Sequence, residues 1–220
     1  MTLDYGEIQQ TISPLRLIFW GGLFCLIDIT YASTDNGEGW KLDLFDDAVG
    51  MILILYGLAR LREVQVDDRY AGALRFVSVV AFFALLQAIH NHFIYQVPPL
   101  LTFLFNVLGV LKLIAIIVFC VAMRRLCESA SLVSASRSWY TTINLFILIY
   151  LLPLGFFYVL AAFAMLTGNN FNYHTDSGDA IMVIPVLLIF FIPLIHFFMS
   201  TSRMINEAEE ISRDETVDQW

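Results

Sequence analysis

Long apolar stretches dominate this chain and constrain its fold more than any other feature. The hydrocarbon core of a bilayer is about 30 Å thick, so an α-helix needs about 20 mostly apolar residues to cross it. We therefore predict an all-α, polytopic integral membrane protein with six transmembrane helices joined by short loops. The six stretches lie at about 14–33, 44–61, 71–95, 98–123, 139–167 and 180–204.

These stretches divide the chain into three parts. Residues 1–13 form an N-terminal segment, residues 14–204 form the transmembrane domain, and residues 205–220 form an acidic tail. Ser13 followed by Pro14 is typical of a helix start, because serine caps the first turn and proline suits its first position. The tail is expected to extend the sixth helix and to fray into a solvated end.

The second stretch, 44–61, is the weakest of the six. Only the run from Ala48 to Ala59 is free of charged residues, which is short for a span. The distribution of arginine supports it nevertheless. Without this helix, the arginines that follow residue 60 would lie on the same side of the membrane as the acidic first loop.

Arginines indicate how the helices are oriented. The chain has twelve Lys and Arg residues, and two of them are Lys41 and Lys112, which leaves ten arginines. With a cytoplasmic N-terminus, all ten fall in inside segments and only Lys41 falls outside. Cytoplasmic loops carry an excess of Lys and Arg, so we expect both termini in the cytoplasm. We predict a multi-pass protein of a cell membrane, specifically the inner membrane of a bacterium.

Composition excludes several classes of protein. Apolar residues make up 59% of the chain and charged residues 15%, whereas soluble domains average about 45–50% and about 25%. A net charge of −8 argues against a nucleic-acid partner, since such proteins carry basic patches. We find no motif for catalysis or for cofactor binding, so we predict a protein that is not an enzyme and has no cofactor.

Lys112 is the most informative polar residue, because it falls near the middle of the fourth stretch. An ionisable group at the bilayer centre costs about 2.5–3.5 kcal/mol on insertion scales, so such groups often have a function. Asp28 is the expected ion-pair partner. With Asn106, Gln87 and His196, these two residues are our candidates for an intramembrane polar or ion path. The alternative is that Lys112 snorkels or forms a structural pair.

A second candidate site lies at the outer face. His90 and His92 end the third stretch, and His174 and Asp176 lie in the third outer loop. Imidazole and carboxylate ligands suit divalent metals, so these four residues are candidate metal ligands. The alternative is that they are interfacial residues hydrogen-bonded to water and lipid headgroups.

Other residues suggest packing rather than chemistry. Gly21 and Gly22 indicate a close helix contact in the first stretch. Trp139 and Tyr140, at the inner edge of the fifth stretch, suggest aromatic anchors at the membrane interface.

Three classes of function remain open. Our first hypothesis is an accessory, scaffold or sensor subunit that acts through helix–helix association, in a homo-oligomer or with a membrane protein partner. The alternative is a small oligomeric transporter or channel with a polar path around Lys112 and Asp28. The third class is a metal-dependent membrane enzyme at the outer face. Apart from protein partners, the lipid bilayer is the expected surrounding.

Overall fold

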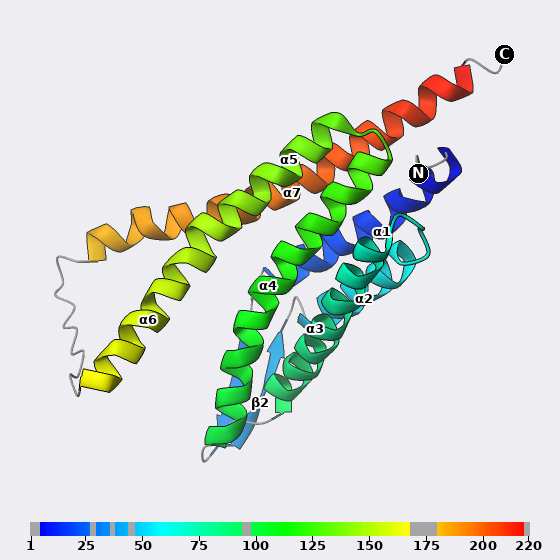
Figure 1. Ribbon diagram of the computed structural model, residues 1–220. Coiled ribbons are helices and arrows are strands. Elements are labelled where there is room, and N and C mark those ends of the chain that lie inside the picture. The colour runs from blue at the N-terminus through cyan, green and yellow to red at the C-terminus, as the bar shows by residue number, and fades with distance from the viewer. Residues whose placement is uncertain are drawn as a thin grey trace.

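The chain folds into long helices with one small β-hairpin, as the computed structural model shows (Figure 1). The structure describes residues 5–26, 30–35, 38–43, 47–93, 98–167 and 180–217. In chain order, the elements are α1 Tyr5–Phe24, β1 Thr30–Asp35, β2 Glu38–Asp43, α2 Asp47–Leu61, α3 Asp68–Phe93, α4 Pro99–Ser129, α5 Val133–Phe146, the π-helical turn η1 Ile147–Leu151, α6 Leu152–Thr167 and α7 Ala180–Val217.

Four segments are long and apolar enough to cross a membrane. They are Asp68–Asn91, Pro99–Ser129, Val133–Leu160 and Leu188–Ile211. They overlap the last four predicted stretches, which confirms a mainly helical fold with helices that could cross a membrane. Within the described residues, α1 and α2 are not among these spans. The helix α2 has only 15 residues, and α1 begins with the polar sequence Tyr5-Gly6-Glu7-Ile8-Gln9-Gln10-Thr11. Six spans and a cytoplasmic orientation stay predictions.

The predicted limits of the first helix are wrong. It begins at Tyr5 rather than at Ser13, so that Pro14 lies inside α1, and it ends at Phe24. Residues 30–33, which we expected to be helical, belong to β1. This strand pairs antiparallel with β2, with Thr30 opposite Asp43. The sequence Asn36-Gly37 between the strands is a strong hairpin signal that a search for apolar stretches overlooks.

Figure 1 shows two arms that meet near the two chain termini and diverge toward the opposite end. The helices α1 to α4 pack in chain order in one arm, and α5, η1, α6 and α7 form the other; α4 packs on α5, and α1 on α7. Where the arms meet, the core is closely packed, and Leu15, Leu61, Met123, Ala135 and Ala208 are buried. Among the described residues, α6 continues directly from η1 and does not pack on α3, α4 or α7 to the extent that the other helices pack on one another.

The turn η1 interrupts an otherwise continuous helix between Val133 and Thr167. Pro153, two residues after η1, has no backbone N–H and its ring crowds the preceding turn. A π-helical turn widens the helix at this point and relieves that crowding. The Tyr150 hydroxyl in η1 donates a hydrogen bond to the carbonyl oxygen of Phe190 and so links η1 to α7.

Glycines allow α1 and α2 to approach closely. A Cβ at Gly21 would lie 2.6 Å from the Gly50 carbonyl oxygen, and one at Gly57 would lie 2.8 Å from that of Pro14. The helices therefore pack backbone to backbone, as small residues permit in membranes. The predicted helix contact at Gly21 is confirmed. A Cβ at Gly22 would meet the Phe198 ring of α7 at an ordinary 3.5 Å.

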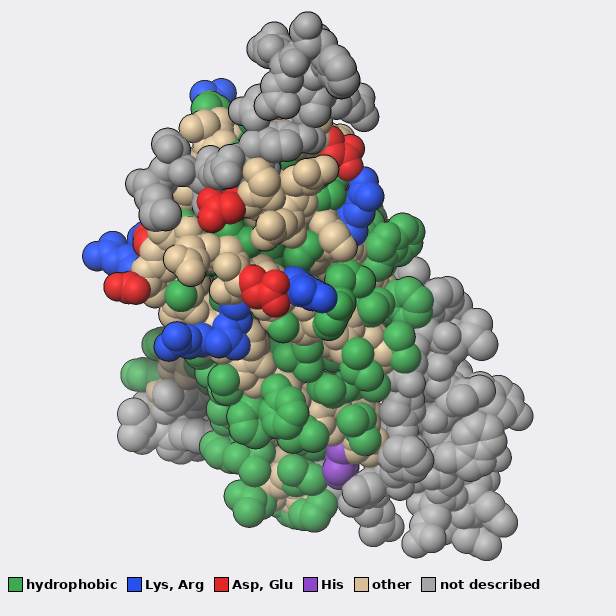
Figure 2. All heavy atoms as spheres, turned by 90° about the vertical axis from the view of Figure 1, so that its right-hand side faces the viewer, with side chains coloured by type: hydrophobic (Ala, Val, Ile, Leu, Met, Phe, Trp, Pro, Cys, Tyr) green, Lys and Arg blue, Asp and Glu red, His purple; other side chains and the backbone are tan. Residues whose placement is uncertain are grey.

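Charged side chains gather near the termini. On the face shown in Figure 2 they lie over the half of the molecule where the arms meet, and hydrophobic side chains cover most of the other half. Arg125 pairs with Asp67 at 2.7 Å, and Arg16 pairs with Glu209. The tail is helical to Val217, which confirms that it extends the last helix. Its first residues pack against the bundle, since Ala208 is fully buried.

Candidate functional site

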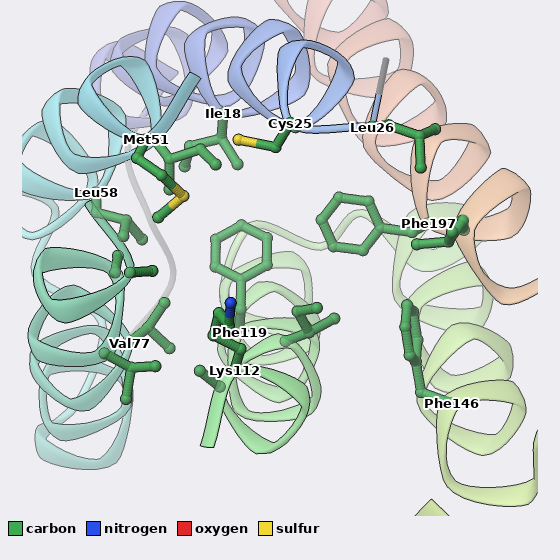
Figure 3. A pocket seen from close by; sticks show the side chains of 18 of the residues that line it. Ile18, Cys25, Leu26, Met51, Leu58, Val77, Lys112, Phe119, Phe146 and Phe197 are labelled. Atoms are coloured by element: carbon green, nitrogen blue, oxygen red, sulfur yellow. The ribbon is translucent and has the colours of Figure 1, made fainter. Parts of the chain in front are cut away.

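A cavity of about 300 Å³ lies between the two arms. Figure 3 shows it from close by, with side chains from α1, α2, α3, α4, α5 and α7 around it. Its lining is almost entirely apolar. The lining residues are Ile18, Gly22, Cys25, Leu26, Met51, Ile54, Leu58, Val77, Val80, Ala81, Ala84, Lys112, Ala115, Ile116, Phe119, Phe146, Leu194, Phe197 and Phe198.

Small residues at helical spacing leave the room for this cavity. In α3, Val77, Val80, Ala81 and Ala84 recur at intervals of three and four residues, so they share one face of the helix. Ala115 lies on the facing wall in α4. A row of larger residues at these positions would fill the space, so the cavity follows from the local sequence.

Aromatic rings form another part of the wall. Phe119 of α4 and Phe197 of α7 lie at the cavity and both pack against Trp139, with ring centroids 6.0 and 5.5 Å away. Trp139 is fully buried, so its predicted role as an interfacial anchor is wrong. The indole supports the two lining phenylalanines instead. The neighbouring Tyr140 is exposed, and Arg124 lies over its ring.

Lys112 is the one charged residue in the described lining. Its Nζ donates a hydrogen bond of 2.9 Å to Oε1 of Gln87 on α3. The ion pairs of the described residues do not include Lys112. It lies thirteen residues after Pro99, or about 20 Å along α4 at 1.5 Å per residue. The cation is therefore held by a neutral amide, deep within a membrane-spanning helix.

The Asp47 carboxylate lies close enough to Lys112 to act on it electrostatically, and Cys25 lies near it in the cavity lining. Asp47 is an exposed residue at the start of α2. Cys25 lines the cavity, and its thiol donates to the Asp47 carbonyl oxygen at 3.7 Å. Cys120 and Cys127 are fully buried by contrast.

The residues predicted to form a polar path do not lie together in the described part of the structure. Gln87 contacts Lys112, but Asn106 is exposed on α4 and is absent from the cavity lining. His196 belongs to a different cluster. Asp28 lies outside the described residues, so its pairing with Lys112 stays a prediction.

His196 belongs to a hydrogen-bonded cluster between α5 and α7. Thr142 Oγ1 lies 2.8 Å from His196 Nδ1 and 2.7 Å from Ser200 Oγ, and Ser200 Oγ lies 2.7 Å from Ser138 Oγ. The three hydroxyl residues are buried. Our reading of the sequence missed them, although their i, i+4 spacing on two helices was the available signal. The cluster joins α5 to α7, as polar residues do between membrane helices.

Of the four predicted metal ligands, the structure describes the side chain of His90 alone. His90 lies against Phe105, with ring centroids 5.2 Å apart, and its buried Nδ1 has no hydrogen-bond partner in the described part of the chain. The His92 side chain, His174 and Asp176 lie outside the described residues. Within the described residues, no group of three potential ligands comes together. The outer metal site stays a prediction.

Comparison with family models, with curated proteins and with solved structures finds no match to this chain. The cavity is the feature from which a function can be inferred. Among the described residues, it combines an apolar volume with one cation, Lys112, which donates a hydrogen bond to a neutral amide. Such a site can bind a molecule that is mostly apolar and carries one hydrogen-bonding or anionic end.

Proposed function

We propose that this protein is a non-enzymatic integral membrane protein that binds a membrane-soluble molecule in the cavity between its arms, as a small carrier or sensor. The apolar cavity at Lys112 carries this proposal. Its volume of about 300 Å³ is within the range of small-molecule pockets, which are mostly apolar with a few polar groups that orient the ligand.

The lining favours an apolar ligand over an ion. Ion paths are lined by rings of carbonyl oxygens or charged side chains that replace the hydration shell of the ion. Among the described residues, the rest of the lining consists of alanines, phenylalanines and other mostly apolar side chains, and Asn106 does not belong to it. A transport role for this protein would therefore concern a lipophilic substrate.

Cys25 provides a test that needs no engineered cysteine. It lines the cavity and is partly exposed, whereas Cys120 and Cys127 are fully buried. The protein is placed in nanodiscs of a zwitterionic phospholipid and alkylated with N-ethylmaleimide, which is uncharged and enters membranes. Mass spectrometry of the peptides then gives the rate at Cys25. Adding a neutral C18 alcohol to the bilayer should slow this rate, because the alcohol occupies the cavity.

Matched variants on α3 control the experiment. Ala84→Phe fills the cavity and should slow alkylation of Cys25 without any added ligand, and the alcohol should have little further effect. Val79→Phe places the same ring on an exposed position of α3 and should behave like the wild type. If the alcohol leaves the rate unchanged in the wild type, the cavity is not a binding site and the proposal fails.

One observation favours a second candidate function, that of an accessory or sensor subunit. The helix α7 continues to Val217 and projects beyond the other helices in Figure 1. Beyond Ile211 the sequence carries three acidic residues, Asp214, Glu215 and Asp218, which suit a basic partner surface. A chain that ends at Ile211 should then lose a partner that purifies in stoichiometric amounts with the full chain. Equal recovery of that partner with both chains would exclude this role for the tail.

A further inference from the structure

The inference that follows rests on the proposed function and concerns the chemistry of the ligand. We infer that the cavity takes a long-chain fatty acid, whose carboxylate binds at Lys112 while its single hydrocarbon chain lies among the apolar side chains. Three features support this assignment: the charge at the cavity, the hydrogen-bonding capacity that remains there, and the depth of the site.

The charge of the site is complementary to an anion. Lys112 is the charged residue of the described lining, and its hydrogen-bond partner Gln87 is neutral. Asp47 acts on it electrostatically from the exposed start of α2. Taking a charge partly out of water is costly unless the charge is paired and hydrogen-bonded. A ligand carboxylate would add an ionic partner to the neutral amide that holds the ammonium among the described residues.

Hydrogen-bonding capacity at the site matches a carboxylate. A lysine ammonium has three N–H donors, and the bond to Gln87 Oε1 uses one of them. Gln87 is not among the lining residues, so its role is to hold and orient the ammonium. The two remaining N–H donors of Lys112 can form charge-assisted hydrogen bonds with a carboxylate in the cavity.

The depth of Lys112 along α4 favours a fatty acid over a phospholipid as the ligand. Lys112 lies about 20 Å from the start of α4, well below the level of the headgroups. A carboxylic acid can pass through apolar surroundings in its neutral, protonated form, whereas a phosphodiester stays charged and pays a large desolvation cost. The volume of about 300 Å³ lies at the lower end of small-molecule pockets, which also favours one chain over two.

The apolar wall accommodates the chain. Ala81, Ala84 and Ala115 line the cavity together with Lys112, and Phe119 and Phe197 add aromatic rings to the wall. Burial of each methylene group contributes about 0.8 kcal/mol in apolar surroundings relative to water. Because a bilayer offers the chain a similar environment, the carboxylate contacts decide which amphiphile is preferred.

Alkylation of Cys25 in nanodiscs tests this inference when the head group of the added amphiphile is varied. Oleic acid, oleyl alcohol and dioleoylphosphatidylglycerol are compared at equal mole fractions in a zwitterionic bilayer at neutral pH. Oleic acid should reach half-maximal protection at a mole fraction about ten- to a hundredfold lower than oleyl alcohol, as expected for charge-assisted hydrogen bonds. Phosphatidylglycerol should protect least.

Variants at the site refine the result. Lys112→Met should abolish the preference for the acid while the alcohol still protects, and Lys112→Arg should retain much of it. Gln87→Leu should reduce the preference. Because Lys112 and Cys25 line the same cavity, a substitution at Lys112 can itself change the alkylation rate, and each variant is therefore compared with its own rate in the absence of amphiphile.

The outcomes separate this inference from the proposed function, and the wild-type comparison needs no variant to fold. Equal protection by acid and alcohol would overturn the fatty-acid assignment and leave the cavity a binding site. Stronger protection by phosphatidylglycerol would overturn it in favour of a phospholipid. If none of the three protects Cys25, the proposed function fails as well.

Discussion

Lys112 donates a hydrogen bond of 2.9 Å from Nζ to Oε1 of Gln87, 25 residues earlier on the neighbouring helix. The bond joins α3 to α4 at the wall of the cavity. Lys112 is partly buried, and this bond uses one of the three N–H donors of its ammonium, which leaves two donors for other partners. This relationship is the basis of the proposed binding site.

The variant Gln87→Leu should destabilise the protein by about 1–3 kcal/mol, because the Lys112 ammonium loses its acceptor while it stays partly buried. Combining Gln87→Leu with Lys112→Met should recover most of this loss, since replacing both partners by apolar groups can be nearly neutral. Thermal unfolding in mild detergent measures both effects. Identical stability of Gln87→Leu and the wild type would show that this bond contributes nothing.

The sequence predicts the helical spans much better than the contacts between them. Spans such as 98–123 follow from apolar composition, which a bilayer requires along a whole helix. Which side chains meet depends on rotation and tilt, and these are set by packing against neighbouring helices. Lys112 could thus be singled out from the sequence, while its contact with Gln87 and the cavity beside it could not.

The error in the first helix has a different physical cause. An apolar window does not distinguish a helix from a short strand, so the stretch 14–33 was read as one span. The Asn36-Gly37 dipeptide and the residues Thr30 and Tyr31 favour a hairpin. The error at Trp139 also arises because sequence alone does not distinguish two environments. An aromatic residue near a predicted helix end can lie at the membrane interface or in the protein core, and Trp139 lies in the core.

Gly50→Ala should disrupt the packing of α1 on α2. A Cβ at Gly50 would lie 2.6 Å from Cys25 Sγ and 2.7 Å from the Gly21 carbonyl oxygen, and overpacking of this kind typically costs about 1–3 kcal/mol. Gly109→Ala is the matched control on α4, because a Cβ there meets nothing within 4 Å. It should leave the melting temperature unchanged or raise it, since alanine favours a helix. Equal effects of the two variants would contradict the close packing.

Glu207→Ala should weaken the attachment of the tail to the bundle. The Glu207 carboxylate accepts hydrogen bonds from the backbone N–H groups of Ser134 at 3.1 Å and Ala135 at 2.7 Å, at the start of α5. Loss of such a cap typically costs about 1 kcal/mol. The exposed Glu210 provides the control, and Glu210→Ala should be neutral. Differential scanning fluorimetry measures the melting temperatures of both variants. An unchanged melting temperature for Glu207→Ala would show that the Glu207 carboxylate does not stabilise the start of α5.

Acidification should release the contact between α3 and α4 at Asp67. The backbone N–H of Tyr70 donates to Asp67 Oδ1 at 2.6 Å, and this bond, followed by the pairing with Arg125, lowers the pKa of the carboxyl group. A lowered pKa means that the stabilisation is present above the unfolded-state pKa of about 3.9 and is lost as pH falls through the lower, folded-state value.

The variant Asp67→Asn tests this pH dependence, because asparagine can still cap the helix but carries no charge. Below about pH 4 the melting temperature of the wild type should fall more steeply than that of the variant. Parallel curves for the two proteins would show that the Asp67 carboxylate does not contribute to acid sensitivity.

Native mass spectrometry of the protein released from nanodiscs that contain oleic acid tests the binding site most directly. The account predicts a complex with one bound oleate for the wild type and for Val79→Phe, and loss of that complex for the cavity-filling variant Ala84→Phe. Retention of the same amount of oleate by Ala84→Phe would contradict the account, because the amphiphile would then be bound somewhere other than the cavity at Lys112.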